Sequence, residues 1–70
     1  YSPERILMIG DAPGDQATAQ AIGCAFFPIR PQHEQESWQQ FIDEAYPRFL
    51  ANDFSPAYQQ KLNQAFNALL

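Results

Sequence analysis

The sequence has few of the residues that cross-link small proteins or bind them to polyanions. Its single cysteine, Cys24, rules out an internal disulfide, and nothing else indicates a secreted, disulfide-rich domain. Four basic residues against eight acidic ones give a formal charge of −4, so nucleic acid and anionic membranes are poor partners. No apolar run approaches the ~20 residues that span a bilayer, and the start lacks a signal-peptide pattern. We therefore expect a cytoplasmic protein.

The chain is nevertheless rich in side chains that build a core. Hydrophobic residues make up 46% of its 70 residues and aromatic residues 14%, which is typical of a globular protein. A domain of this length buries only about 60% of its unfolded surface, so this much apolar surface is hard to hide. We expect residues 1–70 to form a single partial domain, with some apolar side chains facing strands outside this sequence.

The most informative stretch is Ile6–Asp15, an apolar run that ends in a turn with two carboxylates. Four successive large apolar residues predict a strand over about 5–9 that is buried on both faces, because a half-exposed strand would alternate apolar with polar residues. Gly10 then permits a sharp turn. A proline soon after the turn and Gly23 further on mark the start and the end of a helix over 13–22.

The two acidic residues of the turn, Asp11 and Asp15, are four positions apart, which puts them together near the N-terminus of that helix. Open α/β sheets bind ligands at the carboxyl ends of their strands, and Mg²⁺ favours one or two carboxylates with water and phosphate oxygens. A metal site is therefore one interpretation. On spacing alone, an equally good one is that Asp11 caps the helix while Asp15 complements its dipole.

An apolar strand followed by Gly10-Asp11, three residues and Asp15 resembles the fourth conserved motif of the haloacid dehalogenase-like (HAD) hydrolases. In that family the motif helps to hold the catalytic Mg²⁺. The resemblance implies that Asp11 is the direct ligand and that Asp15 binds directly or through water. Phe27-Pro28-Ile29, Glu36-Ser37-Trp38 and Phe41 are similar to the tail of uncharacterised bacterial members.

Other motifs of that family are missing here. The family's nucleophile lies in an Asp-x-Asp motif on an earlier strand, and its phosphate-binding Ser or Thr and Lys also come earlier. This sequence has no Asp-x-Asp, and its one lysine is Lys61. The resemblance therefore implies a C-terminal fragment of a Mg²⁺-dependent, phosphatase-type hydrolase that acts on a small phosphorylated substrate through an outside aspartyl nucleophile. It implies no catalytic residue within the fragment, weak or absent Mg²⁺ binding, and no activity of the fragment alone.

The rest of the chain predicts one more strand and two long helices. Residues 24–29 form a short apolar run that ends in prolines, and this strand should pair in parallel with the first. Apolar residues at three- and four-residue steps then indicate a helix over 36–51, which Pro47 should kink or break. Ser55-Pro56 supplies an N-cap and a first turn for a helix over 55–70. The expected fold is a βαβαα portion of a doubly wound, Rossmann-like α/β core.

The loop over 30–35 should lie at the same sheet edge as the acidic pair, and it carries Arg30 and His33. A contact from either side chain to a phosphate is one interpretation. A solvated turn is the better one, because a lone histidine without neighbouring ligands is weak evidence for a metal site. Cys24 is likewise better explained as a small buried side chain than as a nucleophile.

Two parallel strands do not make a stable sheet alone, and bare edges pair readily with other strands. We therefore expect self-association, through exposed strand edges or through swapped helices. The alternative function is a small acidic protein-interaction module without catalytic activity, in which Asp11 and Asp15 cap the helix and the later helices form the partner surface. A nucleotide-binding loop is disfavoured, because the turn has neither G-x-G-x-x-G spacing nor a Lys-Ser or Lys-Thr ending.

Overall fold

A computed structural model describes residues 2–69, with only the backbone of Glu4. In chain order its elements are the 3₁₀ turn η1 (Pro3–Arg5), β1 (Leu7–Gly10), α1 (Pro13–Ile22), β2 (Ala25–Pro28), α2 (Glu34–Gln40), the π-helix η2 (Phe41–Ala45), α3 (Tyr46–Leu50) and α4 (Pro56–Asn67). The predicted last helical residue, Leu70, lies outside the described residues. None of the helices described has the length and apolar character that crossing a bilayer requires.

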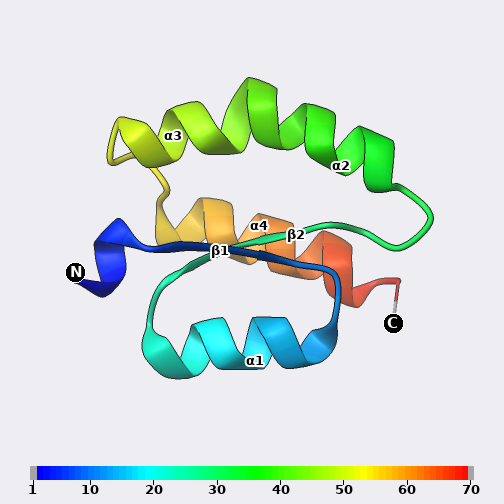
Figure 1. Cartoon of the computed structure of the whole chain (residues 1–70), viewed down its shortest axis with the longest axis horizontal. Helices are drawn as coiled ribbons and strands as arrows, with labels where there is room; N and C mark the ends of the chain where they lie inside the picture. Colours follow the sequence, from blue (N-terminus) through cyan, green and yellow to red (C-terminus); the bar gives the residue numbers. More distant parts are fainter. Residues whose placement is uncertain (1, 70) are drawn as a thin grey trace.

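The two strands form a parallel pair, which confirms the predicted α/β class and the predicted strand direction. Leu7 is opposite Ala25, and Gly10 is opposite Pro28. Figure 1 shows α1 below the strands, the α2–α3 run above them and α4 behind them, with β1 in front of β2. The pair therefore has a helix on each face and a third helix beside β2.

Strand β1 is shorter and more exposed than predicted. The chain before it forms a 3₁₀ turn that is closed by the Ile6 N–H, which donates to the Pro3 carbonyl at 3.1 Å. The strand therefore begins at Leu7, two residues later than expected. Its side chains are half-buried or exposed, with Ile9 38% exposed, so the predicted burial on both faces is wrong. The physical reason is that no strand of the described chain covers the outer edge of β1.

The predicted helix over 13–22 and its glycine terminus are confirmed. Helix α1 ends at Gly23, whose φ of 82° is the left-handed conformation that glycine adopts most easily. The start of α4 is confirmed as well, because the Ser55 side chain accepts a hydrogen bond from the Tyr58 N–H at 3.1 Å. Local signals thus predicted both ends of α1 and the start of α4, whereas α4 ends at Asn67, short of the predicted end at 70.

The sequence predicted a kink or a break at Pro47, and of these the break is wrong, because the helical run continues from Glu34 to Leu50. A π-helix comes directly before the proline, and in it the Tyr46 N–H donates to the Phe41 carbonyl, five residues back. Proline lacks an N–H, and in an α-helix its ring clashes with the carbonyl four residues earlier. The wider π turn accommodates the proline, which then occupies the first turn of α3.

The core lies between the strands, the α2–α3 run and α4. Its buried apolar cluster consists of Phe27, Ile29, Ala45, Tyr58 and Leu62, with Leu7, Phe41 and Phe54 packed against it. The rings of Phe27 and Phe41 meet edge to face with centroids 5.4 Å apart, which fixes the helix above β2. The buried side chains of α4, which are Tyr58, Leu62 and Phe66, are therefore core.

The stripe of the α2–α3 run is only partly core. Its exposed members lie four residues apart on one side of the helix, and range from Trp38 at 46% to Leu50 at 67% exposed. We call three of them, Trp38, Ile42 and Tyr46, the apolar ledge. The Trp38 and Tyr46 rings both contact the ring of half-buried Phe41, so the ledge adjoins the core.

The outer edge of β2 is closed by a side chain. The Phe26 N–H donates to Oε1 of Gln59 at 2.8 Å, and Nε2 of Gln59 donates to the Phe26 carbonyl at 2.7 Å. Nε2 also donates to Oδ1 of Asn63 at 2.9 Å. The Gln59 amide thus makes the two bonds that the backbone of a neighbouring strand would make. The predicted bare edge of β2 is therefore blocked at Phe26.

Replacing Gln59 with alanine should destabilise the protein by about 2 kcal/mol, because a buried N–H and C=O lose their partners together. Urea unfolding followed by circular dichroism measures the change. Gln60→Ala, an exposed change one residue along the same helix, is the control and should shift stability by less than about 0.5 kcal/mol. Equal effects of the two changes would contradict the edge-closing role of Gln59.

Tyr58 is the one described residue with a clear pKa shift. Burial raises the pKa of its hydroxyl above the ordinary value, and the negative charge of Glu44 adds to the rise, while Arg48 opposes it. The Arg48 guanidinium carbon is 4.4 Å from the Tyr58 ring centroid, within range of a cation–π contact. The buried hydroxyl has no hydrogen-bond partner of good geometry among the described residues, so Glu44 acts through proximity and charge.

Because this pKa is higher in the folded than in the unfolded state, stability should fall as pH rises above about 10, where the unfolded chain releases the proton first. Tyr58→Phe should remove that part of the alkaline loss and change stability little at pH 7. Urea unfolding at several pH values between about 8 and 11 tests this. Exposed Tyr46→Phe is the control, and an identical pH profile for the Tyr58 variant and the parent would contradict the prediction.

Candidate metal centre

The acidic pair lies in the turn between β1 and α1. Strand β1 ends at Gly10, and the N-cap of α1 is Ala12, so Asp11 stands between the two elements and Asp15 is in the first helical turn. Asp11 is exposed and Asp15 half-buried. Both therefore lie at the carboxyl end of β1, as the sequence predicted.

Asp15 is held against the backbone of this turn. Its Oδ2 accepts a hydrogen bond from the Ala12 N–H at 3.3 Å, while its own N–H donates to the Ala12 carbonyl at 3.0 Å. A Cβ on Gly10 would lie only 2.5 Å from the same Oδ2, so the carboxylate packs directly on the glycine. Asp15 thus stabilises the start of α1, and Gly10 is required for this close approach.

Asp11 plays no such part. The N-cap position belongs to Ala12, so the alternative in which Asp11 caps the helix is wrong. Its side chain makes no hydrogen bond or ion pair with the residues described. Asp11 is therefore a candidate cation ligand, four residues from the second carboxylate of the turn.

The donors fit part of a Mg²⁺ site. Carboxylate oxygens are hard ligands, and Mg²⁺ is commonly held by one or two of them while water and substrate oxygens fill the remaining positions. Within residues 2–69, no three His, Cys, Asp or Glu side chains lie close enough to hold a metal ion together. The pair alone is therefore an incomplete site.

The loop after β2 lies at the same end of the strand pair as this turn (Figure 1). Among the described residues, no hydrogen bond or ion pair joins the side chain of Arg30 or His33 to the acidic pair. His33 Nδ1 is 3.7 Å from a Glu36 oxygen, and both side chains are substantially exposed. Neither residue is thus part of the candidate centre.

Ser37 organises this loop, a role that the sequence did not reveal. Its fully buried hydroxyl donates to the His33 carbonyl at 2.7 Å and accepts from the Arg30 N–H at 3.0 Å. Both partners are backbone groups, so no side-chain pattern could indicate them.

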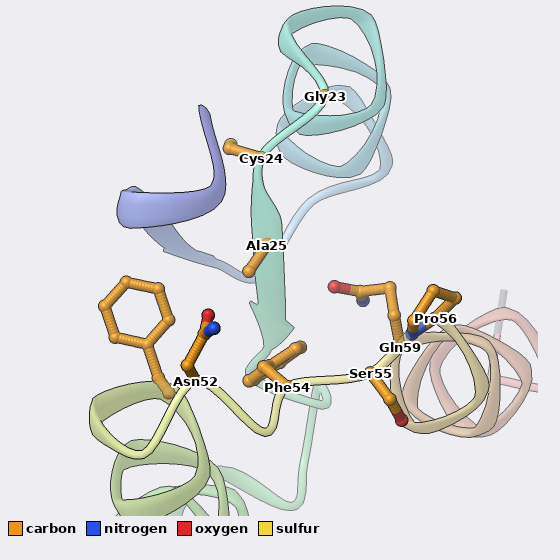
Figure 2. A pocket seen from close by; sticks show the side chains of 9 residues that line it. Gly23, Cys24, Ala25, Asn52, Phe54, Ser55, Pro56 and Gln59 are labelled. Carbon is orange, nitrogen blue, oxygen red and sulfur yellow. The ribbon is translucent and has the colours of Figure 1, made fainter. Parts of the chain in front are cut away.

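A separate pocket of about 240 Å³ lies near the amino end of β2 (Figure 2). It is lined by Gly23, Cys24, Ala25, Phe49, Asn52, Phe54, Ser55, Pro56 and Gln59. Cys24 is a half-buried free thiol, and no acidic or basic side chain lines the pocket with it. The lining therefore offers no base that could activate the thiol.

Comparisons with protein-family models, with curated proteins and with solved structures find no match for this chain. The HAD resemblance therefore remains a prediction that depends on the residues quoted for it above.

Gly10→Ala should destabilise the protein by roughly 1–3 kcal/mol, because the new methyl group would displace the Asp15 carboxylate. Gly14→Ala is the matched control. No atom lies within 4 Å of the methyl position there, and alanine in a helix should be neutral or stabilising by up to about 1 kcal/mol. Thermal unfolding of both variants measures the difference, and a neutral Gly10 variant would contradict the close packing.

Proposed function

We propose that this chain supplies the metal-binding edge of a Mg²⁺-dependent hydrolase with a Rossmann-like, HAD-type core. The observation that carries the proposal is the exposed carboxylate of Asp11, which lies in the same turn as Asp15 at the carboxyl end of a parallel strand. The open outer edge of β1 adds support. A further parallel strand placed there would bring its own carboxyl end to the same turn, which is where a nucleophile would be needed.

The proposed reaction is phosphoryl transfer to an aspartate outside this sequence. That carboxylate attacks phosphorus, the bond to the leaving oxygen breaks, and water then hydrolyses the aspartyl phosphate to release phosphate. When bound, Mg²⁺ would neutralise charge on the transferring group. In this chain Asp11 would hold the metal directly, and Asp15 would add a second oxygen while it orders the turn. The substrate class is a small phosphorylated molecule.

The chain by itself should bind divalent cations weakly and should not turn over phosphate esters. Two carboxylates leave most of the coordination shell to water, and Mg²⁺ gives up its waters reluctantly. Weak binding is still measurable when a paramagnetic ion replaces Mg²⁺.

Mn²⁺ titration followed by amide NMR should broaden the resonances of residues 10–15 first. Asp11→Asn should raise the apparent dissociation constant for Mn²⁺ by more than about tenfold, because it removes a charged ligand. Asp43→Asn is the matched control, since Asp43 is an exposed acidic residue elsewhere on the surface. Broadening that is unchanged in both Asp11→Asn and Asp15→Asn would refute the metal site.

The alternative of an interaction module has one observation in its favour, the exposed apolar ledge beside the core. A module of this kind needs no metal, so Mn²⁺ binding at the turn distinguishes the two functions.

A further inference from the structure

The outer edge of β1 carries unpaired backbone groups. The carbonyls of Ile6 and Gly10 accept hydrogen bonds from Ala25 and Ile29, so these residues direct their polar groups toward the β2 side. Successive residues of a strand direct them to alternate sides. The N–H and C=O groups of Leu7 and Ile9 therefore point to the open side, which faces the viewer in Figure 1.

The apolar ledge overhangs that same open side. On the other flank of the helix, Arg48 lies over a ring of α4, and Gln40 lines a groove with Lys61 and Leu62 of that helix. Helix α4 is beside β2, so the flank with Gln40 and Arg48 is the β2 flank. Successive residues of a helix are rotated by about 100° around its axis. This rotation puts the ledge residues on the other side of the helix's buried face from Gln40 and Arg48, so the ledge projects over β1.

We propose that this surface binds a second copy of the chain. Strand β1 of each copy pairs antiparallel with the other about a two-fold axis at Met8. The product is a four-stranded sheet in the order β2, β1, β1, β2, with the helices of each copy in place. The proposal does not depend on a metal at Asp11.

The strand itself selects this register. Within β1, only Leu7 and Ile9 direct their backbone N–H and C=O groups to the open edge. The register with most hydrogen bonds therefore pairs Leu7 of each copy with Ile9 of the other. Met8 then faces Met8 of the second copy in the non-hydrogen-bonded position. A shift in either direction would lose one of the two pairs, because η1 precedes the strand and a turn follows it.

Charge supports the same register. Arg5 lies just before β1, and Asp11 lies just after it. The antiparallel pairing therefore places Arg5 of each copy opposite Asp11 of the other, once at each end of the paired strands. Both side chains are exposed. Between them the edge is uncharged, so pairing does not bring like charges together despite the net charge of −4.

The spacing of the helices favours a whole second copy over an isolated strand. The α2–α3 run lies above the β1–β2 pair (Figure 1), and its Phe41 ring packs on the Phe27 ring of β2. Its counterpart in a second copy would be two strand spacings away, or roughly 10 Å. That distance suits packed helices, which lie roughly 8–10 Å apart. One symmetric contact would therefore satisfy the strand edge and cover both ledges, whereas a lone strand would leave the ledge exposed.

Disulfide trapping tests the register. In a Cys24→Ser background, Met8→Cys should cross-link two copies, because residues in this position have Cα atoms about 4.5 Å apart, within the range for a disulfide. Ile6→Cys is the control. The register would hold two such cysteines about 14 Å apart along the strands, so it should not cross-link, although Ile6 is the more exposed residue.

Sedimentation equilibrium of the unchanged chain should give the mass of two copies. Ile42→Lys should raise the dissociation constant by about tenfold or more, as expected when an anchor of an interface is lost. Ile22→Lys, an exposed isoleucine on α1, should leave it unchanged. A monomer of the unchanged chain at millimolar concentration, or equal cross-linking of the two cysteine variants, would overturn the proposal. Mn²⁺ broadening of the Ile42→Lys monomer tests the metal site separately.

Discussion

The hydrogen-bonding requirement of a two-stranded sheet governs this molecule. Each strand has two edges, and only one edge of each can be used in the shared β1–β2 ladder. At β2 the second edge is closed by Gln59, a side chain from a helix 33 residues further along the chain. At β1 no such group exists in the described chain, and the groups of Leu7 and Ile9 face outward. The exposure of β1 as an edge strand follows from this asymmetry.

The two carboxylates of the acidic turn differ in how the structure holds them. Asp15 packs on Gly10 and accepts from the Ala12 N–H, which satisfies one of the free donors at the start of α1. Asp11 has no comparable bond. The shape of the turn therefore depends on Asp15 and not on Asp11. The turn thus uses one carboxylate for its own structure and leaves the other without a bond to the described residues.

The sequence predicted those features that depend on neighbouring residues. The helix over 13–22, its left-handed Gly23 and the Ser55 cap were all correct, because their hydrogen bonds close within about four residues. The π turn before Pro47 and the amide of Gln59 were not predictable. The first depends on how a helix packs against the sheet on both sides of a proline. The second pairs groups far apart in sequence, and a glutamine among many on helical surfaces carries no local signal.

The candidate site divides in the same way. The positions of Asp11 and Asp15 followed from a strand, a glycine and a helix start, which are local. The identity of any further ligand or nucleophile depends on what lies beside β1, which no pattern within these residues specifies. A strand with a nucleophile and a second copy of the chain would both need the Leu7 and Ile9 groups, so they exclude one another. An antiparallel partner also places the two acidic turns at opposite ends of the joined strands, too far apart to share one metal ion. The pairing of identical copies would therefore be a resting arrangement, and a complete catalytic centre would require that edge to be released to a different strand.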